Sequence, residues 1–370
     1  MPKKVVLIRS RAIDPTVNRV ARALADGGYT VSLLVWVREG SSKGEKGNGY
    51  DIHRLGLKAP YYKPSLLFYL PIWWFYEFIF LIRSRAAVIH ACDFDTLLPA
   101  VCAKTITRAR LCYTIYDFYA DILPRWIPGV IRWMVASCER FYLRFVDVLF
   151  LVDESRYEQV KGARIKKVDY IYNSPEDRFQ TRPELETSSK TNLFYGGYLD
   201  KSRGLGNMIK GVSELEDVSL TLAGTGPEES VIKDYSSKSG NIKYLGWIPY
   251  EDVITNSLNA DILFAFYDPK VPSNRYASPN KLFEAMMCAK PIIVNEGVTA
   301  SKIVVKYKCG LIVSYGDVKA IKEAVVKLKN DPNLRRELGS NGRKAYENYY
   351  SWEIMKGRLT SAYKELVKSD

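Results

Sequence analysis

Apolar positions along this chain fall into short runs typical of strands and longer stretches with helical spacing. Residues 5–8 form a short β-rich run, and residues 17–25 place apolar side chains at helical spacing. Gly27 and Gly28 mark the end of that helix, and residues 31–37 form a second strand. The pattern therefore predicts that the chain opens with a βαβ unit.

The same alternation fills both halves of the chain. In the first half it predicts further strands at 87–91, 111–115 and 148–152, with helices at 97–103 and 131–145. In the second half it predicts strands at 192–195, 219–224, 242–245, 262–266, 291–295 and 310–313, with helices at 205–212, 280–288 and 318–329. The polar stretch 176–191 suits a linker, and residues 38–50 suit an exposed mobile loop. Two doubly wound parallel sheets follow, with ligands expected beyond the carboxyl ends of their strands.

The composition is that of a folded protein with a basic first half. Of the 370 residues, 47% are hydrophobic and 26% are charged, which excludes global disorder and suits two domains. The formal charge is +13, and residues 1–175 contribute 26 Lys and Arg against 16 Asp and Glu. We therefore expect the first half to face an anionic partner, for which nucleic acid and anionic lipid headgroups both qualify.

Cysteine and histidine usage narrows the chemistry. The six cysteines occur in apolar surroundings without CxxC spacing, which indicates buried thiols in a reducing compartment. With two histidines, His53 and His90, a His-rich metal site is excluded, and we expect no metal and no other cofactor. The apolar run at the N-terminus is too short for a signal peptide, so a cytoplasmic protein is expected.

Two segments of the second half carry the candidate chemistry. Residues 194–204 read FYGGYLDKSRG, in which an apolar run ends at glycines and Arg203 precedes an amphipathic helix. Residues 278–291 begin with Ser278 and Pro279, good first residues of a helix, and Glu284 follows about one and a half turns later. An arginine and free helix-end amides suit an anion, and a carboxylate accepts hydrogen bonds from sugar hydroxyls. Together they predict a nucleotide diphosphate site, although each segment alone also fits an ordinary connection.

Short motifs follow one another in a characteristic order. They are DPTV at 14–17, VIHACD at 88–93, YNSP at 172–175, AGTGP at 223–227, LGW at 245–247, PNKLFE at 279–284 and YSWE at 350–353. In order and spacing they resemble the retaining glycosyltransferases of family 4, and the likeness covers nearly the whole chain. The resemblance implies an α/β fold of the GT-B type, in which two Rossmann-like doubly wound domains flank an interdomain cleft.

The resemblance also implies a role for each part of the chain. Residues 1–175 would form an acceptor-binding domain with membrane-facing helices, 176–191 a linker, 192–350 a nucleotide-sugar-binding domain, and 351–370 a helix that crosses back to the first domain. Glu284 would hold the ribose hydroxyls, and Arg203 with the amides of 278–281 would stabilise the departing diphosphate. The expected donor-binding residues are Gly197, Tyr198, Gly226, Trp247, Ile248, Tyr276, Ser278, Asn280, Lys281 and Glu284, and the expected catalytic residues are Arg203, Glu284 and Asp117.

The acceptor hydroxyl is expected to enter past the loop of residues 14–19. Asp14 or Asp117 would orient it, although Asp14 fits an N-cap role equally well. His90 and Asp93, at a strand end, would line the cleft or cap the next helix. The expected acceptor-side residues are Asp14, Asn18, Arg19, His90, Asp93 and Tyr116.

The chain departs from the family pattern at three places. Tyr198 stands where relatives usually carry an arginine and Arg203 where they carry a lysine, so one phosphate-binding cation is missing. Tyr276 stands where the first of two paired glutamates is usual. Tyr116 stands where a histidine is usual. We interpret these differences as subfamily traits rather than as loss of activity.

Two aromatic segments of the first half indicate contact with a membrane. Residues 64–82 are almost wholly apolar, approach the ~20 residues that span a bilayer, and are interrupted by Pro71 and Glu77. Residues 124–134 repeat the mixture of Trp, Arg and aliphatic side chains. Trp73, Trp74, Phe75, Trp126 and Trp133 are expected at an anionic membrane surface, although both segments also fit core helices.

The sequence thus predicts transfer of a hexose from a nucleotide-sugar donor, with UDP favoured over GDP, to a lipid-linked glycan or glycolipid on the cytoplasmic face of a membrane. The alternatives are a soluble glycosyltransferase with a non-lipid acceptor, a nucleotide-sugar 2-epimerase of the same fold, and a basic adaptor that binds nucleic acid. The scarcity of histidine disfavours the epimerase. The nearly neutral second half disfavours the adaptor, so no nucleic acid partner is expected.

Overall fold

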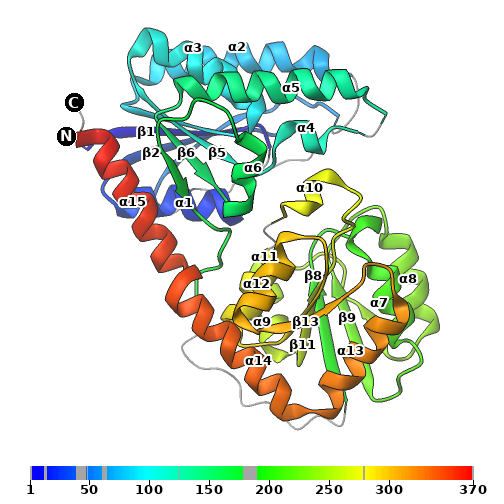
Figure 1. Ribbon diagram of the computed structural model, residues 1–370. Coiled ribbons are helices and arrows are strands. Elements are labelled where there is room, and N and C mark those ends of the chain that lie inside the picture. Colours follow the sequence, from blue (N-terminus) through cyan, green and yellow to red (C-terminus); the bar gives the residue numbers. More distant parts are fainter. Residues whose placement is uncertain are drawn as a thin grey trace. The chain divides into compact units, whose positions relative to one another are not determined.

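The computed structural model describes residues 2–11, 15–38, 47, 49–60, 65–124, 126–177, 190–277 and 280–368. The chain forms two compact units, Met1–Tyr172 with Met355–Asp370 and Asn173–Ile354. Each unit contains one parallel β-sheet with helices on both faces (Figure 1). The two sheets confirm the predicted α/β class with two doubly wound, Rossmann-like domains.

The sheet of the first unit has seven parallel strands in the order β3-β2-β1-β4-β5-β6-β7. They are β1 (Lys4–Arg9), β2 (Thr30–Trp36), β3 (Asp51–Leu55), β4 (Val88–Cys92), β5 (Arg110–Ile115), β6 (Val148–Leu151) and β7 (Val168–Tyr170). The strand order reverses between β1 and β4, where Arg9 is aligned with Cys92. Ligands of doubly wound sheets bind beyond the carboxyl ends of the strands at such a reversal, so this place is the first to search for a site.

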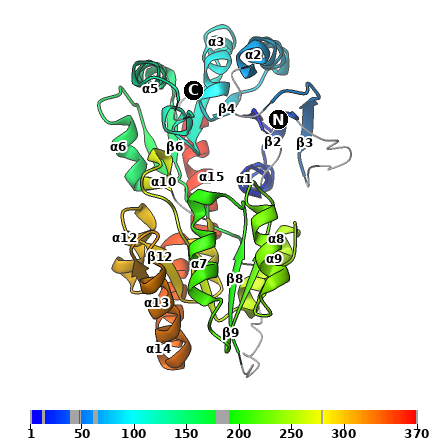
Figure 2. The same ribbon diagram turned by 90° about the vertical axis from the view of Figure 1, so that its right-hand side faces the viewer.

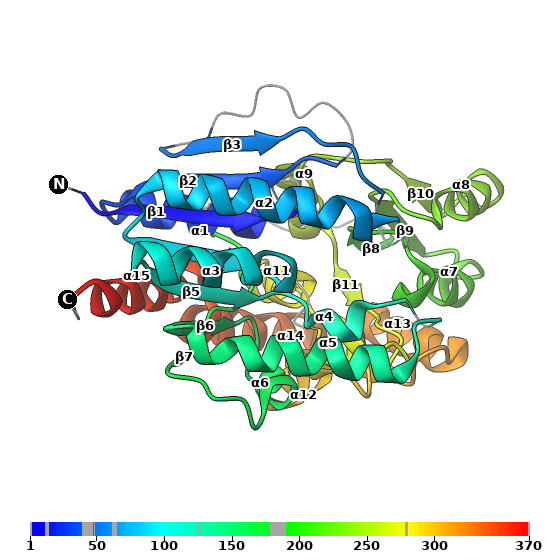
Figure 3. The same ribbon diagram turned by 90° about the horizontal axis from the view of Figure 1, so that it is seen from above.

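Helices α2 (Leu66–Ser84), α3 (Leu97–Thr107) and α5 (Gly129–Tyr142) cover one face of this sheet (Figures 1, 2 and 3). Helices α1 (Pro15–Asp26) and α15 (Trp352–Lys368) cover the other face (Figure 1). Helix α2 buries Leu70, Trp73, Glu77 and Leu81, which are spaced three or four residues apart and form one stripe. The short elements η1 (Phe94–Thr96), α4 (Tyr119–Ile122) and α6 (Tyr157–Val160) follow β4, β5 and β6.

The sheet of the second unit has six parallel strands in the order β10-β9-β8-β11-β12-β13 and reverses between β8 and β11. The strands are β8 (Thr191–Gly196), β9 (Val218–Ala223), β10 (Ile242–Tyr244), β11 (Ile262–Ala265), β12 (Ile292–Asn295) and β13 (Gly310–Val313). The helices are α7 (Leu205–Val212), α8 (Glu229–Lys238), α9 (Tyr250–Asn259), α10 (Pro272–Arg275), α11 (Asn280–Met287), α12 (Thr299–Tyr307), α13 (Val318–Asn330) and α14 (Pro332–Ala345). Helices α7 and α13 pack side by side on one face (Figure 1).

Several elements of the structure were not predicted from the apolar pattern. Strand β3 and helices α8, α9, α12 and α14 are absent from the expected set. In α14 the buried residues are Leu338, Gly339, Gly342 and Ala345, and the two glycines give no hydrophobic signal. The expected mobile loop at 38–50 and the expected linker at 176–191 lie largely outside the described residues.

Candidate functional site

Charged side chains gather beyond the carboxyl end of β8, where the second sheet reverses. The chain turns at Gly197, and a β-carbon there would lie 2.4 Å from Nζ of Lys281, so glycine permits the approach of this lysine. Lys281 stands on the first turn of α11, with Nζ 4.6 Å from the centroid of the Tyr195 ring. The two segments singled out by the sequence therefore meet at this point.

Arg203 and Glu284 complete this cluster. The guanidinium carbon of Arg203 lies 4.1 Å from the ring centroid of Tyr267, a residue just after β11. Glu284 is buried, and its Oε1 accepts a hydrogen bond of 3.1 Å from the Tyr250 hydroxyl. Burial lowers the pKa of Lys281; the Glu284 carboxylate opposes that change, and Arg203 adds to it. Two cations and one carboxylate thus lie within electrostatic reach of one another, an arrangement that suits a diphosphate and a neighbouring hydroxyl.

The remaining expected donor residues lie on loops at the same end of the second sheet. Gly226 follows β9, Trp247 and Ile248 follow β10, Tyr276 directly follows α10, and Asn280 begins α11. Tyr198 and Trp247 expose 56% and 70% of their surfaces, so two large aromatic side chains are accessible to a ligand. A β-carbon on Gly226 would lie 2.3 Å from the Leu199 carbonyl oxygen, so this turn requires glycine. Ser278 lies outside the described residues.

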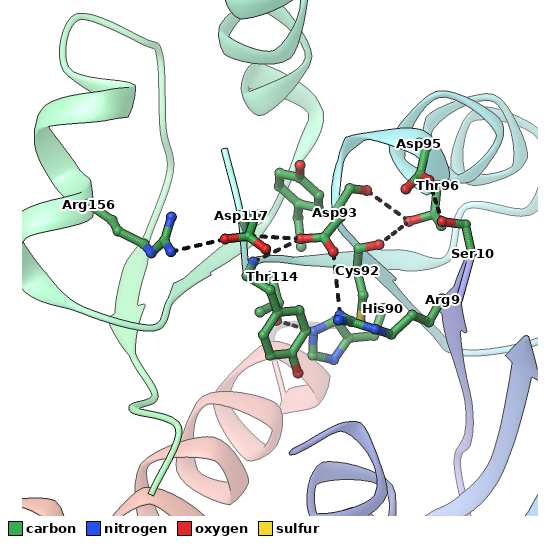
Figure 4. Close-up of polar contacts among 12 residues, drawn as sticks. Arg9, Ser10, His90, Cys92, Asp93, Asp95, Thr96, Thr114, Asp117 and Arg156 are labelled. Carbon is green, nitrogen blue, oxygen red and sulfur yellow. Dashed lines mark hydrogen bonds and ion pairs between the residues drawn. The ribbon is translucent and has the colours of Figure 1, made fainter. Parts of the chain in front are cut away.

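An arginine and an aspartate meet at the strand reversal of the first sheet (Figure 4). Nη1 of Arg9, at the end of β1, lies 3.4 Å from Oδ2 of Asp93, which directly follows β4. Oδ1 of Asp93 accepts hydrogen bonds from the backbone N–H groups of Tyr116 at 2.9 Å and Asp117 at 3.2 Å. The Arg9 guanidinium carbon also lies 4.3 Å from the centroid of the Tyr116 ring. One aspartate thus ties together the ends of β1, β4 and β5.

Asp117 is the carboxylate of this cluster that reaches solvent. Its side chain is 40% exposed, and its Oδ1 lies 3.4 Å from Nη2 of the buried Arg156 (Figure 4). Burial raises the pKa of Asp93 to about 6, although Arg9 and Arg11 oppose this change. An accessible carboxylate beside a buried arginine fits the expected role of Asp117 in orienting a hydroxyl.

The structure corrects the prediction that His90 lines the acceptor side. His90 is buried, its Nδ1 lies 2.6 Å from the Tyr363 hydroxyl of α15, and its Nε2 lies 2.6 Å from the Thr114 hydroxyl of β5. Burial lowers the pKa of His90 to about 3, so the ring is neutral near pH 7. Both ring nitrogens therefore serve the packing of the first unit rather than a ligand.

The other expected acceptor-side residues are engaged within the first unit or lie outside the described residues. Oδ1 of Asn18 on α1 accepts a hydrogen bond from the Tyr50 hydroxyl. Arg19 is buried, with Nη2 3.4 Å from the Thr16 hydroxyl oxygen. Asp14 is not among the described residues. Residues 15–19 belong to α1 rather than to the expected loop, and their direct contact with an acceptor stays a prediction.

Sequence reasoning missed three arginines of the first unit, Arg9, Arg38 and Arg156. Arg38 lies just beyond β2, with Nη2 3.5 Å from Oδ2 of the buried Asp95 and its guanidinium carbon 4.1 Å from the Trp36 ring centroid. The sequence pattern could have indicated Arg9 and Arg38, because each is the first charged residue after a buried apolar run. Arg156 has no such signal, since its partner Asp117 is 39 positions away.

The membrane-contact prediction needs correction at Trp73. Trp73 is fully buried, and Trp74 is partly buried with its indole N–H donating to the Asp95 carbonyl at 2.9 Å. Phe75 and Trp133, in contrast, expose 69% and 66% of their surfaces. The exposed apolar side chains of these segments are Leu67, Phe68, Ile72 and Phe75 on α2 and Trp126, Val130, Ile131, Trp133 and Met134 at or just before α5. Both helices lie on the same face of the sheet (Figure 3).

Among the described residues, α2 is the one helix long and apolar enough to cross a membrane, a property that core helices of soluble proteins share. Its one acidic residue, Glu77, faces inward beside Trp73 in the buried stripe. Burial, and then the nearby Asp95 carboxylate, raise the pKa of Glu77 well above its ordinary range. Helix α2 therefore turns its polar position toward the protein and apolar positions toward solvent.

Two family models match most of the chain. The model described as Glycosyl transferase 4-like domain matches residues 11–174, and the model described as Glycosyl transferases group 1 matches residues 177–345. The two doubly wound domains, together with these two matches, identify a glycosyltransferase of the GT-B fold. The chain belongs to the glycosyl transferases group 1 family, with a glycosyl transferase 4-like first domain.

Curated relatives and a solved structure resemble the chain in different ways. The GDP-mannose-dependent monoacylated alpha-(1-6)-phosphatidylinositol monomannoside mannosyltransferase of Corynebacterium glutamicum is 30% identical over 51% of this chain and 51% of that protein. The capsular polysaccharide biosynthesis glycosyltransferase CapM of Staphylococcus aureus is 30% identical over 47% of this chain and 46% of that protein. The chain thus matches about half the length of these relatives. Sucrose-phosphate synthase of Thermosynechococcus elongatus, 18% identical, covers 100% of both chains with a TM-score of 0.81, which shows the fold.

Proposed function

We propose that this protein is a retaining glycosyltransferase that moves a hexose from a nucleoside diphosphate donor to a hydroxyl of a membrane-associated, lipid-linked acceptor. The observation that carries the proposal is the cluster of Arg203, Lys281 and Glu284 at the strand reversal of the second sheet. Two relatives support the proposal, because one acts on a mannosylated phosphatidylinositol and the other serves capsular polysaccharide biosynthesis.

The charges of the donor cluster suit departure of a diphosphate. Arg203 and Lys281 neutralise the negative charge that grows on the leaving group as the glycosidic bond breaks, leaving an oxocarbenium-like sugar. Their positions beside Tyr267 and Tyr195 are fixed before the reaction, so little reorganisation is needed. Glu284 accepts hydrogen bonds from ribose hydroxyls. The proposed reaction needs no bound metal, and EDTA is expected to leave the rate unchanged; EDTA-sensitive turnover would count against this mechanism.

The acceptor side of the proposal rests on the first unit. Residues 1–175 carry a net positive charge, with 26 Lys and Arg against 16 Asp and Glu. Helices α2 and α5 lie on one face of the first sheet, and contact with lipid would remove their exposed apolar side chains from water. An anionic membrane surface is therefore the proposed partner, with α2 lying in the plane of the interface on the cytoplasmic face.

A ligand screen tests the donor half of the proposal. Thermal unfolding is recorded with UDP, GDP and their sugars at millimolar concentration; UDP is favoured by the sequence, while the Corynebacterium glutamicum relative uses GDP-mannose. A diphosphate that binds the native state raises the unfolding midpoint. Absence of stabilisation by every nucleoside diphosphate and nucleotide sugar would overturn the proposal.

A product assay then separates the enzyme classes. The donor selected by the screen is incubated with extracted membrane lipids of the source cell, and sugar transfer to lipid is followed with retention of the anomeric configuration. Release of a 2-epimer would instead identify an epimerase. Transfer only to water-soluble acceptors would identify a soluble glycosyltransferase.

A further inference from the structure

Asp93 combines a strained backbone with a side chain that binds three other residues. Its φ and ψ are 65° and 163°, a region almost restricted to glycine because a β-carbon there clashes with the backbone. Arg85, Arg108 and Lys308 also have positive φ, but each ends a helix in the ordinary left-handed region. Asp93 ends no helix, so its conformation needs another explanation.

We propose that Asp93 is a positioning residue of the acceptor-side site, and that its strained backbone is kept because the carboxylate fixes Arg9 and the Tyr116–Asp117 segment at the strand reversal. The proposal rests on the proposed function in one respect, that Asp117 meets the acceptor. The strain and the contacts themselves are independent of it.

The surroundings hold the Asp93 backbone from both sides. Its N–H donates to the Thr114 carbonyl of β5 at 3.0 Å. Its carbonyl accepts hydrogen bonds from the N–H of Thr96 at 3.2 Å and from the Thr96 hydroxyl at 3.0 Å. A sparsely populated conformation persists where the neighbouring structure dictates it in this way.

The Asp93 side chain does not perform the alternative task of capping the next helix. It precedes η1 but makes no side-chain cap hydrogen bond. Oδ1 instead reaches across to the N–H groups of Tyr116 and Asp117, and Oδ2 faces Arg9 (Figure 4). A glycine at this position would relieve the strain but would leave those partly buried donors without their acceptor.

Asp93 acts on a ligand through Asp117. Asp93 is 6% exposed, whereas the Asp117 side chain is 40% exposed. The hydrogen bond to the Asp117 N–H fixes the backbone from which the accessible carboxylate projects, and Arg156 limits that carboxylate on its other side. Displacement of this segment would move the group proposed to orient the acceptor hydroxyl, and small displacements of such groups lower rates strongly.

The ionisation of Asp93 gives the proposal a pH signature. The titratable or charged groups that face it are Arg9, Arg11, Asp95, Tyr113, Asp117, Tyr119 and Glu139. Burial raises the pKa of Asp93 to about 6, and Arg9 is the first of the groups that oppose this change. A protonated carboxyl binds the two N–H groups and Arg9 more weakly, so the segment loosens as the pH falls below about 6.

The first experiment measures strain and positioning without an activity assay. Asp93→Gly and Asp93→Ala both remove the carboxylate, but only glycine relieves the strain, so the glycine variant should unfold about 3 °C or more above the alanine variant. At an unstrained position the order would be reversed. In hydrogen exchange, the peptide spanning residues 112–121 should exchange at least tenfold faster in Asp93→Gly than in wild type, with Asp93→Asn between them.

The second experiment measures function. Asp93→Asn should raise the acceptor KM and abolish the fall in sugar transfer below about pH 6, while stabilisation by the nucleoside diphosphate stays as in wild type. Arg9→Gln, which leaves the strained backbone unchanged, should move that fall to higher pH. Stabilisation by the diphosphate distinguishes failure of the proposed function from failure of the positioning role of Asp93. If the diphosphate does not stabilise wild type, the proposed function is refuted, and the exchange result is unaffected.

Two results would overturn the inference. An alanine variant as stable as the glycine variant would show that the Asp93 backbone is not strained. Unchanged exchange of the 112–121 peptide in Asp93→Gly, or an unchanged acceptor KM and pH profile in Asp93→Asn, would show that Asp93 has no positioning role.

Discussion

Nδ1 of His90 lies 2.6 Å from the hydroxyl oxygen of Tyr363, although the two residues are 273 positions apart in the chain. This contact joins β4 to α15, and the Tyr363 ring also stacks on Phe150 of β6 with centroids 6.3 Å apart. The last helix is therefore fixed to the first unit by a buried polar contact between aromatic side chains, and a neutral imidazole is part of it.

Protonation of His90 should weaken the fold at acid pH. Burial lowers its pKa in the folded state to about 3, below the ordinary value of 6.5, so the unfolded chain takes up the proton first as the pH falls. Stability from this group is present above pH 6.5 and declines by up to about 1.4 kcal/mol per pH unit between 6.5 and 3. Urea unfolding of wild type and His90→Gln across this range measures the effect, and equal acid slopes in both would contradict it.

Glu139 should act in the opposite direction. It is buried, accepts hydrogen bonds from the Tyr113 hydroxyl at 2.7 Å and the Tyr119 N–H at 3.1 Å, and burial raises its pKa to about 8. The folded state therefore keeps the proton longer than the unfolded state. Stability from this group is present below its ordinary pKa of 4.5 and is lost as the pH rises through 8.

Glutamine at position 139 isolates this effect. Glu139→Gln has no charge to bury, so its unfolding midpoint should fall less than that of wild type between pH 5 and 9. Glu158→Gln, at an exposed position of α6, is the matched control and should retain the wild-type slope. Identical slopes for Glu139→Gln and wild type would exclude Glu139 as the source.

Removal of one charge from the donor cluster should weaken nucleotide binding. Arg203→Ala and Glu284→Ala should each reduce the affinity for the stabilising nucleoside diphosphate or its sugar about 10- to 100-fold, because each loses a charge-assisted hydrogen bond. Titration calorimetry measures this loss. Arg336→Ala on the exposed side of α14 is the control and should bind as wild type does. If neither cluster variant binds more weakly, the donor site lies elsewhere.

Charges on the exposed apolar side chains of α2 and α5 should weaken membrane binding. Phe68 and Trp133 expose 81% and 66% of their surfaces on α2 and α5. Phe68→Glu and Trp133→Glu should each lower binding to vesicles containing anionic lipid about tenfold, since burial of such a side chain contributes ~1.5–3 kcal/mol. Val305→Glu, 64% exposed in the second unit, is the control in vesicle sedimentation. Equal sedimentation of all three variants would refute the assigned face.

The spacing of apolar residues was sufficient to predict the fold class, because it indicates which residues of each segment are buried. Buried runs such as 5–8 and 262–265 marked their strands directly. Glycine and alanine fill much of the buried stripe of α14, so the same reasoning failed there. In the candidate donor site, the sequence named Arg203, Lys281 and Glu284 because each belongs to a recognisable local segment.

The sequence by itself determined the class of fold, the basic first half and the residues of the two candidate donor segments, since these follow from local pattern and composition. Only the tertiary structure decided the partners of buried polar groups. It placed His90 against Tyr363, Trp73 in the core rather than on the surface, and Asp93 between Arg9 and the end of β5. These contacts join positions from 23 to 273 residues apart, and no local propensity encodes which strand ends will meet when the sheet forms.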